Sequence, residues 1–140
     1  MTIPIYQVDA FAEKVFQGNP AAIVPLEQWL DEELMQQIAM ENNLSETAFF
    51  VKTGTSYHLR WFTPEYEIDL CGHATLASSF VIKNFIDTSI TEVHFTTQKA
   101  STLNVYVNED VYTLDFPLRI PHTCNVPDLL FGKYWNEIFS

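Results

Sequence analysis

The chain has 140 residues, of which 47% are hydrophobic and 14% aromatic, so it can bury a sizeable core and is not typical of a disordered protein. It carries 7 basic and 18 acidic side chains, a formal net charge of -11. Nucleic-acid binding and electrostatic attachment to anionic membranes are therefore excluded, because both depend on Lys and Arg. The even composition predicts a single domain.

The cysteines and the apolar segments indicate the compartment. Cys71 and Cys124 are too few for the disulfide framework of a small secreted domain. The N-terminal sequence has no basic segment followed by an apolar run, and the longest uncharged apolar stretch, residues 70–82, is too short to span a bilayer. We therefore expect a cytoplasmic, reduced protein without membrane contact.

The N-terminal part begins with two predicted strands. Residues 3–11 are rich in Ile, Val and aromatic residues, and residues 21–24 form a second apolar run after a Gly-Asn-Pro turn signal. Over residues 32–42 the period changes, with Leu34 and Ile38 at helical spacing, which predicts an amphipathic helix. Asp31 is its expected N-cap, and the Asn pair at its end its expected stop.

A hairpin is predicted next. Residues 47–51 and 57–63 are strand-like and are separated by a four-residue loop containing Gly54. In the second strand His58 and Arg60 alternate with apolar residues. We expect both of these polar side chains to face solvent.

The remaining elements complete the fold class. Residues 72–85 are apolar nearly all round with one charge, Lys83, which predicts a helix buried in the core. Three further strands are predicted at 92–97, 102–107 and 111–116, followed by a proline-rich stretch and a short helix over 128–140. The sum is an α+β protein with many antiparallel strands, one surface helix and one buried helix.

Cys71, Gly72 and His73 stand at the start of the buried helix. The free amides of such a helix start bind carboxylates or phosphates, and they lower the pKa of a nearby thiol. The alternative is structural, with Cys71 a small buried residue and His73 an ordinary residue of the first helical turn. Position alone leaves both interpretations open.

A zinc site could combine Cys71 and His73 with His122 and Cys124. Both pairs have one intervening residue, whereas structural zinc sites prefer two to four. We therefore expect no metal.

Glu46 is a lone carboxylate at the entrance to an apolar strand. Partial desolvation there would suit it to general acid–base chemistry, and the alternative is an exposed Glu at a strand edge. The residue pattern alone leaves the second interpretation open.

Four segments together carry a resemblance to a known family: residues 18–22 (GNPAA), 43–49 (NLSETAF), 60–64 (RWFTP) and 69–75 (DLCGHAT). In this order and spacing they resemble the phenazine-biosynthesis isomerase (PhzF-like) family, which is related in fold to diaminopimelate epimerase. The resemblance implies a diaminopimelate epimerase-like lobe, an antiparallel sheet curled around a buried central helix. It divides the chain into an N-terminal lobe, residues 1–116, and a segment, 117–140, that is a Pro-rich tail or the start of a second lobe.

Full-length members of this family have two pseudo-symmetric lobes with the active site in the cleft between them. The resemblance implies a biosynthetic isomerase or epimerase that uses no metal or organic cofactor and moves a proton on a small carboxylate-bearing substrate. The family's second-half Asp and Gly-Ser motifs are missing here, so we expect a truncated lobe, inactive alone unless completed by a second lobe or a homodimer. The alternative is a non-catalytic domain that binds small acids or a protein partner.

The resemblance assigns the catalytic roles to two residues. Glu46 matches the family's acid–base Glu, and His73 matches the His that lies against the substrate. We expect them to converge near the first turn of the buried helix on one open surface, because a base and an anion holder must serve one substrate.

The resemblance also implies a substrate-binding set. Gly72 and the amides that follow it, including that of Ala74, match the helix start that holds a substrate carboxylate. Cys71 matches the position of a catalytic thiol in related epimerases, with its role here left open. Asn19 matches a position that is either a substrate contact or a turn former.

Overall fold

The computed structural model describes residues 2–11, 14, 17–99 and 102–116. The elements follow the chain as β1 (Tyr6–Ala10), β2 (Asn19–Leu26), α1 (Glu32–Asn42), β3 (Glu46–Thr53), β4 (Ser56–Phe62), β5 (Glu67–Ile68), α2 (Gly72–Val81), the π-helical turn η1 (Ile82–Ile86), β6 (Glu92–Thr96), β7 (Leu103–Asn108) and β8 (Val111–Asp115). Both long helices and all strands except β5 were predicted. The segment 117–140, with its expected tail or second-lobe start, lies outside the described residues.

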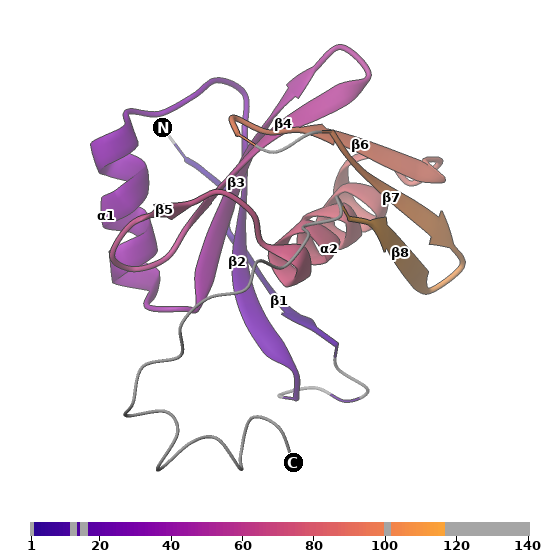
Figure 1. Ribbon diagram of the computed structural model, residues 1–140, viewed down its shortest axis with the longest axis horizontal. Coiled ribbons are helices and arrows are strands. Elements are labelled where there is room, and N and C mark those ends of the chain that lie inside the picture. The colour runs from indigo at the N-terminus through magenta and orange to yellow at the C-terminus, as the bar shows by residue number, and fades with distance from the viewer. Residues whose placement is uncertain (1, 12–13, 15–16, 100–101, 117–140) are drawn as a thin grey trace, which may run out of the picture.

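The strands form one eight-stranded sheet in the order β1-β2-β3-β4-β6-β7-β8, with β5 paired to β4. The sheet curls around α2, which contacts β1 near one end of the sheet and β8 at the other (Figure 1). This is the expected α+β lobe with a central helix. Among the described residues, no helix is long and apolar enough to cross a membrane.

The sheet is mixed, which corrects the expectation of purely antiparallel strands. β2 pairs with β3 in parallel, and so does β4 with β6. The chain passes through α1 between the first two strands and through α2 between the second two. Such crossovers return the chain in the same direction, whereas hairpins reverse it.

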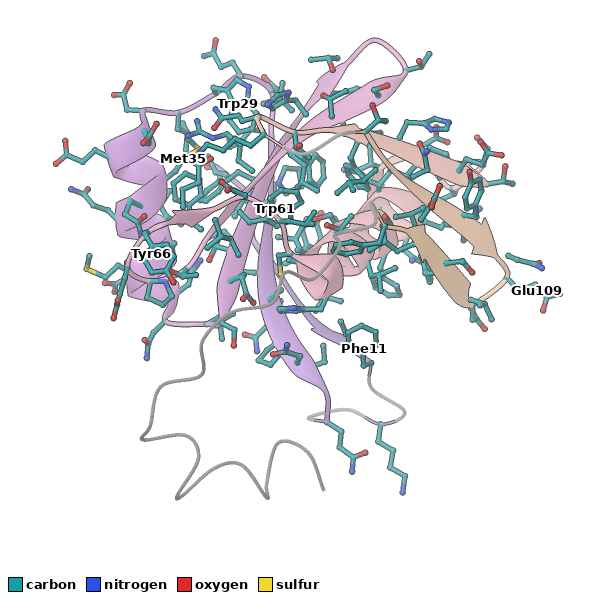
Figure 2. The ribbon with its side chains drawn as sticks, viewed as in Figure 1. Phe11, Trp29, Met35, Trp61, Tyr66 and Glu109 are labelled. Atoms are coloured by element: carbon teal, nitrogen blue, oxygen red, sulfur yellow. The ribbon has the colours of Figure 1, made fainter. Side chains whose placement is uncertain are left out.

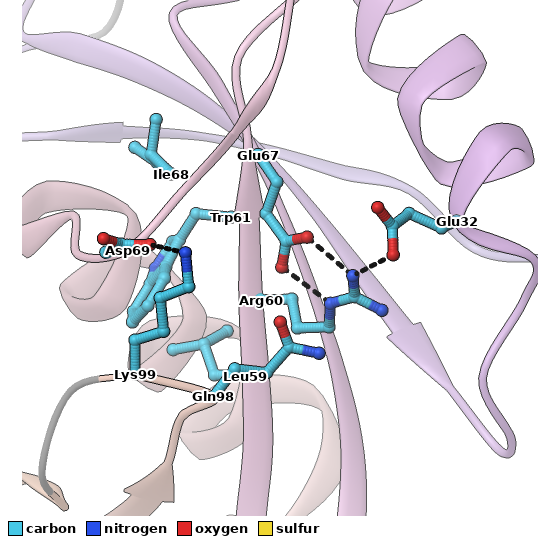
Figure 3. A pocket seen from close by; sticks show the side chains of 9 residues that line it. All are labelled: Glu32, Leu59, Arg60, Trp61, Glu67, Ile68, Asp69, Gln98 and Lys99. Carbon is cyan, nitrogen blue, oxygen red and sulfur yellow. Dashed lines mark hydrogen bonds and ion pairs between the residues drawn. The ribbon is translucent and has the colours of Figure 1, made fainter.

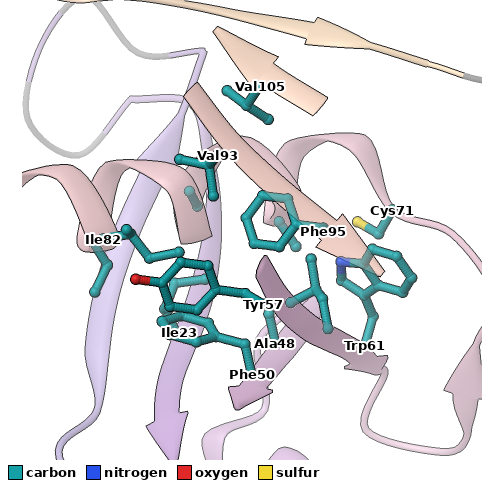
Figure 4. Packing of buried hydrophobic residues seen from close by; sticks show 14 of the residues in the cluster. Ile23, Ala48, Phe50, Tyr57, Trp61, Cys71, Ile82, Val93, Phe95 and Val105 are labelled. Carbon is teal, nitrogen blue, oxygen red and sulfur yellow. The ribbon is translucent and has the colours of Figure 1, made fainter. Parts of the chain in front are cut away.

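The sheet separates two apolar clusters. Successive side chains of a strand point to opposite faces, so Ile23 and Phe50 join the cluster around α2, while Val24 and Phe49 join the one under α1. Figure 4 shows the larger cluster, which also includes Trp61 and reaches Cys71 at the start of α2. The site at that helix start therefore rests on the main core.

Helix α1 covers the other face of the sheet. Met35 and Ala39 form its buried side (Figure 2), whereas Leu34 of the expected stripe is 41% exposed. Asp31 occupies the N-cap position without a side-chain capping bond, and Asn43 ends the helix in the left-handed conformation with a φ of 51°. The helix bounds are thus as predicted, and Met35 and Ala39, which widen the expected stripe of Leu34 and Ile38, form its most buried part.

The β3–β4 hairpin is tighter than predicted. Its pairing continues to Thr53 opposite Ser56, so the loop is shorter than the four residues expected, and Gly54 takes a positive φ of 65° in it. His58 is half-buried, with Nδ1 3.1 Å from Thr96 Oγ1. The partner on β6 explains why this side chain is not fully solvated.

Arg60 is buried, which corrects the expectation that it faces solvent. Its Nε and Nη2 donate to both carboxylate oxygens of Glu67 at 2.7 and 2.6 Å, and Nη2 also donates to Glu32 at 3.0 Å (Figure 3). The guanidinium lies between the rings of Trp29 and Phe62, 5.6 and 5.3 Å from their centroids. Arg60 therefore ties the segment before α2 to the sheet.

Candidate functional site

Glu46 is the first residue of β3 and lies opposite Ala21 of β2. Alternation places its side chain on the same face as Ala48 and Phe50, which pack in the cluster around α2. Only 16% of the Glu46 side chain is exposed. The carboxylate thus points toward the helix start rather than into bulk water.

His73 lies in the first turn of α2 and meets Glu46. Its Nε2 is 2.7 Å from Glu46 Oε2, and its side chain is 11% exposed. Both atoms are shielded from solvent, and neither has a hydrogen-bond partner of good geometry among the described residues, because the ring N–H is not aligned with the oxygen. The expected convergence is therefore present, in a more enclosed setting than the open surface expected.

Cys71 precedes α2 and contacts the other ring nitrogen of His73. Its Sγ is 3.3 Å from Nδ1, and the residue is 7% exposed. Burial raises the pKa of the Cys71 thiol to about 11, and the charge of Glu46 adds to this, while hydrogen bonds from the amides of Ala74 and His73 lower it. Of the two interpretations left open for Cys71, the structure supports the small buried residue, because desolvation outweighs the effect of the helix start on the thiol pKa.

The amides at the start of α2 were expected to hold a carboxylate. In this structure the amides of His73 and Ala74 interact with the Cys71 thiol and lower its pKa. Thr75 donates to the Cys71 carbonyl through Oγ1 at 2.6 Å and through its amide at 3.2 Å. An incoming carboxylate would have to share these donors with the thiol.

Gly72 leaves room for a close approach by the Phe116 side chain. A Cβ at this position would lie 2.9 Å from a ring carbon of Phe116 and 3.8 Å from Leu114. The Phe116 ring therefore covers the helix start from the end of the described chain. Sequence reasoning missed this contact, since the two residues are far apart in the chain.

Asn19 lies outside the cluster of Glu46, Cys71 and His73. It is exposed at the start of β2, two positions before Ala21, which is paired with Glu46. Gly18 before it has a φ of 100°, which requires glycine. The structure thus places Asn19 at the same end of the sheet as Glu46, next to a tight turn.

The cluster offers three ligand types within 4.8 Å of one another, a carboxylate of Glu46, the Cys71 sulfur and an imidazole nitrogen of His73. The ring, however, turns Nδ1 to the sulfur and Nε2 to the carboxylate. His122 and Cys124, the other two residues of the zinc site considered from the sequence, lie outside the described residues.

A separate polar cleft of about 180 Å³ lies beside Arg60 and Glu67, with Asp69 and Lys99 on its wall (Figure 3). Its lining does not include Glu46 or His73. The charged residues of this cleft form ion pairs with one another, and we therefore assign them a structural role.

Comparison with known sequences identifies relatives. The sequence pattern of the family described as phenazine biosynthesis-like protein (PhzC-PhzF) matches residues 8–125. A Pseudomonas aeruginosa protein named uncharacterized isomerase is 51% identical over 128 residues, 91% of this chain and 49% of that protein. A human phenazine biosynthesis-like domain-containing protein is 44% identical over 130 residues, 87% of this chain and 45% of that protein.

Solved structures show the same fold. A phenazine biosynthesis protein of the PhzF family from Enterococcus faecalis superposes with a TM-score of 0.82 at 57% identity, covering 91% of this chain and 49% of that one. A predicted epimerase from Pseudomonas aeruginosa superposes with a TM-score of 0.66 at 25% identity, covering 79% and 41%. The chain spans about half the length of the relatives it matches.

Proposed function

The chain belongs to the phenazine biosynthesis-like protein family, and we propose that it is one lobe of a cofactor-independent isomerase that moves a proton on a small carboxylate-bearing substrate. The observation that carries the proposal is the 2.7 Å approach of Glu46 Oε2 to His73 Nε2. Both atoms are buried without a well-directed partner in the described part of the chain. Buried polar atoms left in this state are uncommon, and a catalytic role is one explanation for them.

The proposed chemistry divides the work between the two side chains. The Glu46 carboxylate removes a proton from a carbon next to the substrate's carboxylate and returns it to another carbon or to the other face. The negative charge that develops on the substrate is stabilised by the His73 N–H and by the positive end of α2, which begins at Gly72. The Ala74 amide donates to the substrate carboxylate, which takes the place of the Cys71 sulfur as its acceptor. Asn19 contacts the substrate from the start of β2.

The catalytic lobe in this proposal is residues 1–116. A proton abstracted from carbon must be protected from water, and half of a cleft does not exclude it. A second lobe, as the relatives' double length suggests, or a second copy of this chain supplies the other wall. A two-fold homodimer is the commonest closed assembly and would bring two Glu46–His73 pairs toward a shared cleft.

The second candidate is a binding domain without catalysis. The interaction of the His73 and Ala74 amides with Cys71 favours this second candidate, because these amides already have an acceptor and are not free to bind a substrate carboxylate. A reducing cytoplasm suits both candidates, since Cys71 forms no disulfide with any of the residues that the structure describes.

Isotope exchange separates the two candidates. The 140-residue chain is incubated in D₂O with a panel of small carboxylates that carry a C–H next to the carboxylate, and deuterium uptake is followed by mass spectrometry. With the cleft closed by a second copy of the chain, the proposal predicts uptake into at least one compound and a rate at least ~100-fold lower in Glu46→Gln. Equal uptake with Glu46→Gln, or binding to saturation without any uptake, favours the binding domain.

A further inference from the structure

The surroundings of the Cys71 sulfur determine which way its hydrogen bond to His73 runs. Sγ and Nδ1 are 3.3 Å apart, so one of the two atoms must donate. The amides of Ala74 and His73 already donate to the sulfur. The protonated thiol also carries one hydrogen, which it can donate to Nδ1 at the 3.3 Å distance.

We propose that Cys71 is a positioning residue whose thiol donates to Nδ1 of His73 and thereby keeps the imidazole proton on Nε2, the ring nitrogen nearer to Glu46. The two ring nitrogens of a neutral histidine exchange roles, and the partner of one nitrogen selects the state of the other. A donor at Nδ1 makes that nitrogen the acceptor. The remaining ring proton is then on Nε2, 2.7 Å from Glu46 Oε2.

The opposite tautomer fits the contacts less well. A proton on Nδ1 would point at a sulfur that two amides already approach. It would also leave the Nε2 lone pair 2.7 Å from a carboxylate oxygen, which is repulsive while Glu46 is ionised. Burial raises the pKa of the Cys71 thiol to about 11, so the thiol keeps the hydrogen that it donates throughout the neutral range.

The consequence for catalysis rests on the proposed function. A proton held on Nε2 makes His73 a hydrogen-bond donor to substrate and leaves Glu46 as the base. Without the thiol, Glu46 alone would favour the proton on Nε2, so the Nδ1–H tautomer would become populated and the fraction of molecules with the correct donor would fall. Cys71 thus acts through His73 and does not itself take the substrate proton.

The test is the ¹⁵N spectrum of the His73 ring in the 140-residue chain at mildly alkaline pH, which identifies the protonated nitrogen directly. The proposal predicts Nε2–H in the wild type and in Cys71→Ser, whose hydroxyl also donates, and a mixture of tautomers in Cys71→Ala. Thr75→Val is the matched control, because it removes the bond to the Cys71 carbonyl and leaves the thiol in place. Its ring should remain Nε2–H.

Two results would overturn the proposal: a proton on Nδ1 in the wild type, or an unchanged single Nε2–H tautomer in Cys71→Ala. If Cys71→Ala does not fold, as judged by its amide spectrum, the wild-type measurement still decides. The readout needs no substrate, so failure of the isomerase proposal in the isotope-exchange experiment and failure of the tautomer proposal here are distinguishable.

Discussion

Glu46 and His73 approach within 2.7 Å although one begins β3 and the other lies in the first turn of α2, with β4 and β5 between them in the chain. The curl of the sheet brings β3 into contact with the central helix, and the first residue of β3 meets the first turn of that helix. The site therefore depends on how the segment before α2 is held, which makes Arg60 and its partners the first target for mutation.

Glu67→Gln should lower the free energy of unfolding by about 2 kcal/mol, because it leaves the buried Arg60 guanidinium without its bidentate partner. Urea denaturation followed by circular dichroism measures this. Asp69→Asn is the matched control: its pair with Lys99 is exposed, 54% and 72%, and removing it should cost less than about 1 kcal/mol. Equal losses in the two variants would show that Arg60 does not anchor the segment.

Cys71 should react slowly with iodoacetamide at neutral pH, because burial raises the pKa of its thiol to about 11 and only the thiolate is the nucleophile. The rate should keep rising up to that pH instead of reaching a plateau near the ordinary value for cysteine. The Cys124→Ser background restricts alkylation to Cys71, and unfolded chain in urea is the reference. A plateau at the pH found for the unfolded chain would contradict this prediction.

Gly72→Ala should destabilise the chain by about 1 kcal/mol, because the new methyl group meets the Phe116 ring. The loss should shrink in the Phe116→Ala background, where the ring is absent. Gly54→Ala is the control: it has open space around its Cβ and a positive φ of 65°, so its cost is one of backbone strain and should be the same in both backgrounds. Strictly additive effects of Gly72→Ala and Phe116→Ala in urea denaturation would show that the contact is absent in solution.

The proposed homodimer predicts a mass that rises with concentration in multi-angle light scattering. The reason is that, in the proposed function, this lobe forms one wall of the cleft and a second copy supplies the other. Glu46→Gln should dimerise like the wild type, because it removes charge and keeps shape. A strictly monomeric mass at the highest concentration would leave a second lobe as the remaining way to close the site.

Much of the fold followed from local pattern. The helical period over 32–42 and the apolar character of 72–85 predicted both helices, and the four motif segments brought Glu46 and His73 together through the family resemblance. The parallel pairing of β2 with β3 and of β4 with β6 could not be predicted from the local pattern, because the direction of pairing depends on where a helix returns the chain. Strand alternation alone does not carry that information.

Two features of the site also required the three-dimensional arrangement. Arg60 was expected in solvent because its strand alternates, yet its partners Glu32 and Glu67 come from α1 and from a strand of two residues that has no periodic signal. The Cys71 thiol stands at a helix start, a position that by itself lowers the pKa of a thiol. Its burial against the core, which no local pattern shows, reverses the direction.

The central claim is that Glu46, His73 and the start of α2 act on one ligand. The most direct measurement is an NMR titration of the 140-residue chain with small mono- and dicarboxylates, followed at the Glu46 carboxyl, the His73 ring and the Ala74 amide. We predict that all three signals respond with one dissociation constant. The signal of Asn104, a residue of β7 whose side chain contacts His94 of β6, should stay unchanged. Responses with different constants, or a response confined to residues outside this cluster, would contradict the claim.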